Sequence, residues 1–203
     1  MFHGRRLLFA TGVKDKLPEI KGMQERWGTS VFHCPYCHGY ELKKGRIGVI
    51  ATGPMSLHQA QLLPDWGEVT FFTNGAITLD QAARDDLAKR GVTIEDERIA
   101  EIAGLADIIL HNGGRLAFAG LFTAPFVSPS SDVAEKLGCT VDETIMGTIL
   151  QVNNAKETTI PGAFACGDTA RIPHSVSLAV ADGAWAGAQL HRSLVWPDRE
   201  EAA

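Results

Sequence analysis

The segment I-G-V-I-A-T-G-P, residues 47–54, is the clearest fold signal in the chain. Its first five residues form an apolar run typical of a buried parallel strand, and Thr52-Gly53-Pro54 forms a turn. Residues 56–63 then predict a helix, and residues 69–73 predict a second strand that ends at Asn74-Gly75. This order of strand, helix and strand predicts an α/β fold with a parallel sheet.

The same alternation continues beyond residue 75. Residues 79–90 predict an amphipathic helix that ends at Gly91, and residues 92–94 predict another strand. The sequence H-N-G-G at 111–114 has the composition of a hairpin turn, flanked by short apolar strands at 108–110 and 116–118. These elements extend the α/β region toward residue 118.

The segments outside this region have a different texture. Residues 5–10 form a short apolar run that enters a turn at Thr11-Gly12, and Pro18 and Gly22 punctuate a connector that we interpret as a crossover between domains. We interpret residues 120–126 as a second crossover. The later elements that we expect are a helix at 132–137, strands at 148–152 and 163–166, and a helix at 175–194. The side chains of the last helix are small and apolar on most of its faces, which predicts that other elements enclose it.

Between the first crossover and the β-α-β unit lies V-F-H-C-P-Y-C-H-G-Y-E, residues 31–41. Cys34 and Cys37 have the spacing of a redox-active pair, and His38 could stabilise a thiolate and carry its proton. The same spacing is also half of a zinc site, which His33, His38, Cys139 or Cys166 could complete. A third alternative is a pair of inert core cysteines. The eleven residues alone leave these readings open.

Composition excludes several classes of function. The formal net charge is −5 and no block of Lys or Arg occurs, which argues against nucleic acid as a partner. No run approaches the ~18 apolar residues that a membrane-spanning helix needs. Residues 5–10 are too short for the apolar part of a signal peptide, so we expect a cytoplasmic protein. In a reducing compartment a Cys-x-x-Cys pair is catalytic or metal-binding rather than a structural disulfide.

Four features occur in an order that resembles the low-molecular-weight thioredoxin reductases, which are FAD-dependent pyridine nucleotide-disulfide oxidoreductases. The features are a strand ending at Ala10-Thr11-Gly12, the Cys34-x-x-Cys37 pair, the β-α-β unit, and T-I-P-G-A-F-A-C-G-D at 159–168 before a small-residue helix. The motif C-P-Y-C-H-G-Y-E is most similar to the branch that contains gliotoxin-type dithiol oxidases. The resemblance covers nearly the whole chain.

This resemblance implies two Rossmann-like three-layer dinucleotide-binding domains. The FAD-binding domain would comprise residues 1–22 and 119–203, and the NAD(P)-binding-like domain, which carries the dithiol, residues 23–118. Cys37 would lie against the flavin, Cys34 would exchange with the substrate, and His38 would be the acid–base group. Asp168 would bind the ribityl chain, and the N-terminus of the last helix would stabilise a reduced, anionic flavin. The remaining expected cofactor-binding residues are Thr11, Gly12, Gly53, Gly167, His174, Ser175 and Val176.

Two departures from the family pattern affect the expected cofactors. The nicotinamide turn reads Ala51-Thr52-Gly53-Pro54-Met55-Ser56, in which the first alanine and the proline work against a backbone cradle for pyrophosphate. We therefore expect FAD as the cofactor and doubt NAD(P)H binding in the usual mode. Family members also begin with a Gly-x-Gly-x-x-Gly unit for the ADP half of FAD, and this sequence starts after it.

We therefore expect an incomplete FAD domain with an exposed sheet edge, and weak or no FAD binding by this chain alone. Such an edge favours a homodimer or association with the segment that the family has at its N-terminus. The function that we predict is thiol–disulfide oxidoreduction through Cys34 and Cys37. The substrate would be a small dithiol or disulfide, or a thioredoxin-like protein. The alternatives are a non-catalytic Rossmann-like remnant and a zinc-stabilised binding module.

Overall fold

The computed structural model describes residues 3–197 and divides the chain into two compact units. We call Leu17–Pro125 the dithiol unit, and Met1–Lys16 together with Phe126–Ala203 the split unit. The boundaries that the sequence suggested, after residues 22 and 118, differ from these by several residues. Two features place both connectors in the dithiol unit. Lys21 forms a bridge to Glu101, and residues 120–123 form a strand of the central sheet of that unit.

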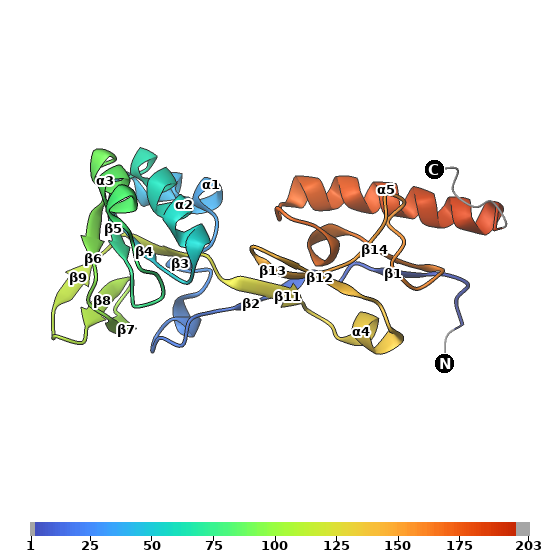
Figure 1. Cartoon of the computed structure of the whole chain (residues 1–203), viewed down its shortest axis with the longest axis horizontal. Coiled ribbons are helices and arrows are strands. Elements are labelled where there is room, and N and C mark those ends of the chain that lie inside the picture. The colour runs from blue at the N-terminus through green and yellow to red at the C-terminus, as the bar shows by residue number, and fades with distance from the viewer. Residues whose placement is uncertain (1–2, 198–203) are drawn as a thin grey trace. The chain divides into compact units, whose positions relative to one another are not determined.

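The dithiol unit is built on a parallel sheet of five strands in the order β3-β10-β4-β5-β6, of which Figure 1 labels β3, β4, β5 and β6. These strands are β3 (Val31–Phe32), β10 (Gly120–Thr123), β4 (Arg46–Ile50), β5 (Glu68–Phe72) and β6 (Thr93–Glu95). A three-stranded antiparallel sheet consists of β7 (Ile99–Ala103), β8 (Asp107–Leu110) and β9 (Arg115–Ala117). The helical elements are η1 (Gln24–Arg26), α1 (Pro35–His38), η2 (Tyr40–Leu42), α2 (Pro54–Leu62), η3 (Leu63–Asp65) and α3 (Gln81–Lys89).

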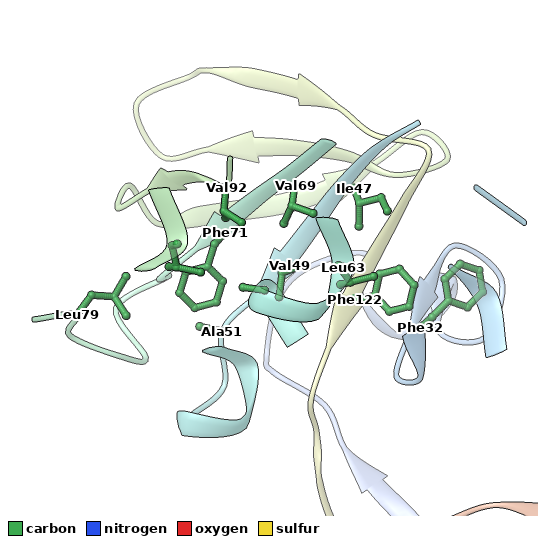
Figure 2. Close-up of a cluster of buried hydrophobic side chains, with 12 residues drawn as sticks. Phe32, Ile47, Val49, Ala51, Leu63, Val69, Phe71, Leu79, Val92 and Phe122 are labelled. Carbon is green, nitrogen blue, oxygen red and sulfur yellow. The ribbon is translucent and has the colours of Figure 1, made fainter. Parts of the chain in front are cut away.

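Alternation along the central strands separates two cores. On β4, Ile47 and Val49 belong to the cluster that packs under the helices, whereas Ile50 belongs to the cluster beneath the antiparallel sheet. Figure 2 shows the first cluster, in which Val69 and Phe71 of β5 lie beside the β4 side chains. Because successive side chains of a strand point to opposite faces, one apolar run supplies both layers. The unit therefore has three layers, as the α/β prediction requires.

The interpretation of residues 120–126 as a crossover is wrong for its first half. Gly120–Thr123 forms β10, which is fully buried and pairs with β3 on one side and β4 on the other. Gly48 of β4 allows this close packing, because a Cβ there would lie 2.5 Å from Leu121 Cδ2. The partners of β10 are distant in sequence, so local composition gives no sign of the pairing.

The split unit contains two small sheets. The strands β1 (Leu7–Phe9) and β14 (Ala163–Ala165) form a parallel pair. A four-stranded sheet has the order β12-β13-β11-β2. Its strands are β12 (Val141–Thr144), β13 (Gly147–Leu150), β11 (Phe126–Pro129) and β2 (Val13–Lys16). The helical elements are α4 (Val133–Leu137), η4 (Gly167–Ala170) and α5 (Val176–Val195).

Helix α5 does not match the prediction that other elements enclose it. Within the described residues only Asp182 and Ala186 of this helix are buried, while Val176 and Val180 are 82% and 68% exposed. The reason is that only one side of α5 packs against β14 and η4. No helix among residues 3–197 is long and apolar enough to cross a membrane.

Candidate functional site

The two cysteines of the Cys-x-x-Cys motif stand at the end of β3, on the carboxyl edge of the parallel sheet. The chain leaves β3 at Phe32, and Cys34 is the N-cap of α1. Pro35 occupies the first turn, where its fixed φ suits a helix start and its missing N–H costs no intrahelical hydrogen bond. Cys34 is half-buried, Cys37 is exposed, and both are free thiols. The carboxyl edge of an open α/β sheet is where such folds bind ligands.

Trp66 packs against α1 and the glycine that ends it. A Cβ on Gly39 would lie 2.8 Å from Trp66 Cγ and 2.7 Å from the Pro35 carbonyl oxygen, so only glycine fits at the end of α1. The Tyr36 ring stands edge-on to Trp66 with the ring centroids 5.5 Å apart. Tyr36 and Tyr40 are otherwise largely exposed, at 76% and 87%. The dithiol is therefore flanked by accessible aromatic surface.

The two sulfurs interact with each other. A hydrogen bond with Cys34 raises the pKa of Cys37 to about 11, and burial and the Cys34 charge add to the effect. Because the thiolate is the reactive form, a Cys37 that keeps its proton is a poor nucleophile near neutral pH. The more exposed sulfur of the pair is thus the one whose proton is held by its neighbour.

His38, the last residue of α1, is held by an aromatic contact. Its ring stacks on Phe32 with centroids 4.2 Å apart and the planes 11° from parallel. Its Nδ1 is buried and has no hydrogen-bond partner in the protein. Most buried polar atoms in proteins are paired, so a nitrogen left open one residue from Cys37 is suited to hold or pass a proton.

The zinc alternative finds no ligand set in the part of the chain that is described. Among residues 3–197, no three side chains of His, Cys, Asp or Glu come together in a way that could hold a metal ion. Cys139 and Cys166 are buried in the split unit, Cys139 within its apolar cluster. Among the described residues, Cys34 and Cys37 thus have no third ligand beside them of the kind that a structural zinc site uses.

The turn at Gly53 lies on the same carboxyl edge and is closed by its own side chains. The Thr52 N–H donates to Ser56 Oγ at 2.9 Å, and the Thr52 hydroxyl donates to the carbonyl of Ala124. Pro54 removes a backbone donor at the first turn of α2, and Gly53 has an extended conformation. Pro54 thus leaves the N-terminus of α2 with one N–H group fewer for a phosphate, and the doubt about NAD(P)H stays a prediction.

The residues expected at FAD come together in the split unit. Thr11 and Gly12 follow β1, Gly167 and Asp168 follow β14, and these two strands are parallel neighbours. Ser175 caps α5 by accepting the Leu178 N–H at 3.2 Å. Gly12 and Gly167 have φ of +68° and +70°, a conformation that favours glycine. The expected residues His174, Ser175 and Val176 lie just before or at the start of α5. The carboxyl ends of β1 and β14 and the start of α5 therefore form one contiguous edge.

Unpaired polar atoms cluster at this edge. Asp168 Oδ1, Thr169 Oγ1, Arg171 Nε and His174 Nε2 are all buried without a hydrogen-bond partner. Folding seldom leaves such atoms unpaired, and four within seven residues mark a place where a polar ligand would bond. The residues present thus fit a polar ligand such as FAD.

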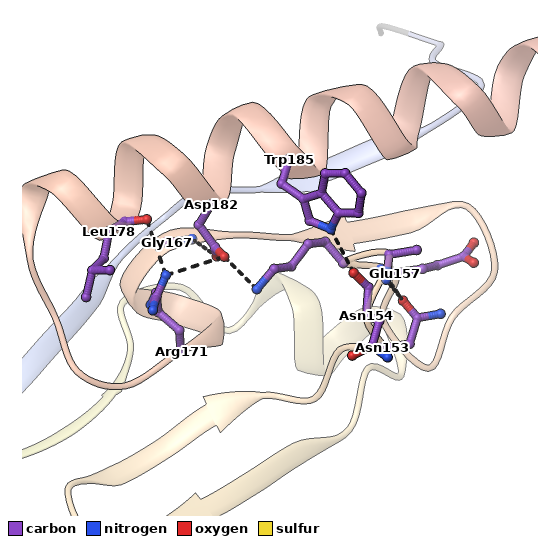
Figure 3. Close-up of polar contacts among 10 residues, drawn as sticks. Asn153, Asn154, Glu157, Gly167, Arg171, Leu178, Asp182 and Trp185 are labelled. Atoms are coloured by element: carbon purple, nitrogen blue, oxygen red, sulfur yellow. Dashed lines mark hydrogen bonds and ion pairs between the residues drawn. The ribbon is translucent and has the colours of Figure 1, made fainter. Parts of the chain in front are cut away.

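Asp182 is a residue of this edge that the sequence analysis missed. Its carboxylate accepts the Gly167 N–H at 2.9 Å and pairs with Lys156 Nζ at 2.6 Å (Figure 3). The Arg171 guanidinium lies 3.6 Å from the same carboxylate. Trp185 adds a second tie by donating to the Asn154 carbonyl at 2.8 Å. Asp182 therefore fixes the Gly167-Asp168 turn to the buried side of α5.

Gln59 is a second residue that the sequence analysis missed, on the buried side of α2. Its Nε2 donates to the carbonyl of His33 at 2.6 Å and to that of Thr123 at 3.3 Å. A glutamine within an ordinary helical pattern gives no signal of such a role, because its partners are backbone atoms distant in sequence.

These observations define a class of protein, one that combines a dinucleotide-type α/β unit bearing a free dithiol with a second unit that offers a polar ligand edge. A family model described as pyridine nucleotide-disulphide oxidoreductase matches residues 2–183. The chain belongs to the pyridine nucleotide-disulphide oxidoreductases.

Individual relatives are thioredoxin-reductase-like. The chain is 29% identical to thioredoxin reductase aclD of Aspergillus oryzae, over 98% of this chain and 67% of that protein. It is 30% identical to thioredoxin reductase tcpT of Claviceps purpurea, over 96% of this chain and 64% of that protein. The solved structure of an oxidoreductase from Agrobacterium tumefaciens is 56% identical, with a TM-score of 0.91 over 95% of this chain and 65% of that one. The chain spans about two thirds of the length of these relatives.

The comparisons confirm the resemblance to thioredoxin reductases and the mixed α/β, Rossmann-like fold. The dithiol with His38 and Gly53 lies in one unit, and the expected FAD residues lie in the other. The roles of the individual site residues stay predictions.

Proposed function

We propose that this chain carries the dithiol relay of an FAD-dependent thiol–disulfide oxidoreductase. The observation that supports the proposal best is the Cys34–Cys37 pair, two free thiols that interact with each other on the carboxyl edge of a parallel sheet. Membership of the pyridine nucleotide-disulphide oxidoreductases supports the same chemistry.

The proposed exchange starts at Cys34. Its thiolate attacks one sulfur of a substrate disulfide, the substrate S–S bond breaks, and Cys34 and the substrate form a mixed disulfide. The released substrate thiolate takes a proton, which His38 provides or relays. Cys37 then loses its proton and attacks the Cys34 sulfur, which releases the second substrate thiol. The substrate gains two electrons and two protons, and Cys34 and Cys37 are left as a disulfide. The reverse sequence oxidises a substrate dithiol.

The residues at the carboxyl ends of β1 and β14, Asp168 and His174 among them, would hold FAD. When bound, this cofactor supplies or takes up the electron pair of the dithiol. The N-terminus of α5 carries partial positive charge and would favour an anionic, reduced ring. The buried, unpaired Asp168 Oδ1 supports a role in accepting a hydroxyl of the ligand.

The proposal includes no NADPH site of the usual kind. The support is the closed Thr52–Ser56 turn and Pro54 at the start of α2. The electron pair would then enter or leave through another donor or acceptor. Saturable NADPH binding at micromolar concentration, measured by nucleotide fluorescence, would contradict this part of the proposal.

The exposed aromatic surface at Tyr36 and Tyr40 supports a substrate with apolar groups beside its sulfurs. A small disulfide or dithiol meets that requirement, and so does the apolar rim around the thiols of a thioredoxin-like protein. We propose a small disulfide or dithiol as the first substrate class to test. Both tyrosines lie within three residues of a cysteine of the pair, so a small molecule could contact the tyrosines and the sulfurs together.

The exchange can be tested without any cofactor. Reduced wild-type protein should release two equivalents of thiol from Ellman's reagent and end as an intramolecular disulfide, with no adduct detected by mass spectrometry. Cys37→Ser should retain a stable adduct on Cys34, because no second thiol resolves it. Cys34→Ser should likewise release a single equivalent and keep a stable adduct, now on Cys37, because no second thiol resolves it. The control Cys139→Ser, at a buried site in the other unit, should behave like wild type.

Two separate adducts on the wild-type protein would show that Cys34 and Cys37 do not act as a pair. The relay would then be wrong, and a non-catalytic Rossmann-like domain would be the better description.

A further inference from the structure

Gln59 connects the helix layer of the dithiol unit to the ends of two strands. It is 5% exposed, and its side-chain amide donates to the carbonyls of His33 and Thr123. His33 follows β3 and Thr123 ends β10, and these strands are neighbours. One amide group thus spans the carboxyl edge at the position where the chain turns toward Cys34.

The other partner of this contact is itself fixed. The Thr123 hydroxyl donates to the carbonyl of Ile50 at 3.0 Å, and Thr123 is fully buried. The hydrogen bonds therefore run from the end of β4, through the end of β10 and Gln59, to His33. The pairing of β3 with β10 ends at Phe32, so the hydrogen bond from Gln59 to the His33 carbonyl holds the chain directly before Cys34.

The choice of glutamine fits this arrangement. Both partners are carbonyl oxygens, so the side chain must donate two hydrogen bonds, which an amide can do and a carboxylate cannot. Asparagine, which is one methylene shorter, would not bring its Nδ2 within these distances of both carbonyls. A buried side chain that donates twice at one strand edge constrains the backbone on both sides of it.

We propose that Gln59 is a positioning residue for the dithiol, holding the His33 carbonyl so that Cys34 and Cys37 keep the separation at which their sulfurs interact. This inference rests on the proposed function of the pair. Without the two hydrogen bonds, the His33–Cys34 peptide loses its tie to α2, and the contact between the sulfurs weakens. The equilibrium between dithiol and disulfide then shifts, and Cys37 gives up its proton more easily.

The test compares Gln59→Met with Gln61→Met in the full chain. Methionine matches the length of glutamine but donates no hydrogen bond, and Gln61 lies two residues further along α2, where its amide contacts the exposed Asp86. We expect Gln59→Met to change the equilibrium constant of the pair with glutathione by about fivefold, the size of one to two lost hydrogen bonds. The alkylation of Cys37 should begin at lower pH than in wild type. Gln61→Met should leave both quantities unchanged.

A milder variant keeps the test decisive if Gln59→Met does not fold. Gln59→Asn retains the amide but is one methylene shorter, so it reaches at most one carbonyl, and its effects should fall between wild type and the full loss. Its control is Gln61→Asn. If the Gln59 variants lose stability in urea while the glutathione equilibrium and the Cys37 alkylation profile match their controls, Gln59 is a structural residue only and the inference is overturned.

The two readouts separate this inference from the function on which it rests. If the wild-type pair fails the exchange with Ellman's reagent, the proposed function fails. The pH profile of Cys37 alkylation still decides the role of Gln59, because it depends on the contact between the sulfurs and not on turnover.

Discussion

Cys37 holds its proton because of its neighbour rather than because of its surroundings. The side chain is exposed, and the hydrogen bond with Cys34 is the main cause of its raised pKa. The different roles that we propose for the two sulfurs follow from this one hydrogen bond. In the proposed exchange, Cys34 attacks first, and Cys37 becomes reactive only when Cys34 is held in a mixed disulfide and no longer bears charge.

The contact predicts the behaviour of Cys34→Ala. Removing the partner should lower the pKa of Cys37 from about 11 toward its ordinary value of 9.0. Between these two values the wild-type thiol stays protonated and the variant thiol ionises. Iodoacetamide should therefore alkylate Cys37 severalfold faster in Cys34→Ala than in wild type near pH 10, measured by peptide mass spectrometry. Cys139→Ala is the control and should leave the profile unchanged.

The raised pKa of Cys37 also makes the stability of the fold depend on pH. A thiol whose pKa is higher in the folded chain than in the unfolded one stabilises the fold below pH 9, and that contribution is lost as the pH rises through about 11. Cys34→Ala should therefore weaken the loss of stability between pH 9 and pH 11. Identical alkylation profiles in both proteins would show that the two sulfurs do not interact.

At the scale of elements, the buried charge of Asp182 joins α5 to the Gly167-Asp168 turn. Asp182 joins the Gly167 N–H, Lys156 and Arg171, and all of these groups are largely shielded from water. The attraction offsets the cost of removing these charges from water only while the set is complete. The start of α5 and the Gly167-Asp168 turn therefore depend on each other.

Replacing Asp182 with Asn should destabilise the chain by about 3 kcal/mol, because Lys156 is left buried without its partner. The measurement is urea unfolding, followed by circular dichroism. The control is Asp132→Asn, which breaks an exposed pair with Lys136 and should cost less than about 1 kcal/mol. Equal costs for the two variants would show that the buried set contributes no more than a surface pair.

Elements whose signal is local could be predicted from the sequence. The run β4-α2-β5-α3-β6 was predicted to within about two residues, because apolar period and Gly or Pro punctuation mark each boundary. β10 was taken for a crossover, because it is short and its partners are distant. β2 was not predicted, because Val13–Lys16 is mostly exposed and charged.

The site divides in the same way. The cysteine pair and the Gly167-Asp168 turn have sequence motifs, and the fold places each of them at the carboxyl end of a parallel strand. Gln59 and Asp182 act on backbone atoms 26 and 15 residues away, and no motif records such contacts.

At the scale of the whole molecule, the split unit has much apolar surface and a small core. Its buried cluster consists mostly of alanine and cysteine together with Phe9 and Leu150. In the described part of the chain, β1 pairs with β14 alone, and parallel sheets are normally covered and larger. These properties support the proposal that this unit associates with another polypeptide, a second copy included.

We expect sedimentation velocity to show concentration-dependent association of the purified chain. Val180→Glu should weaken this association, because the introduced glutamate places a charge on the exposed face of α5. Ile145→Glu, at an exposed apolar site between β12 and β13, is the matched control. A wild-type chain that stays monomeric at every concentration would contradict the proposal.

The positions of the four thiols have a practical consequence. Cys139 and Cys166 are buried in the split unit, and burial raises the pKa of Cys166, so both are silent while that unit is folded. If the split unit opens first, its thiols become available to the oxidised pair of the other unit. Wrongly paired, cross-linked chains should then accumulate during storage under air. The number of reactive thiols, measured against denaturant concentration, would thus show the order in which the two units unfold. A reductant in the buffer should slow the cross-linking during storage.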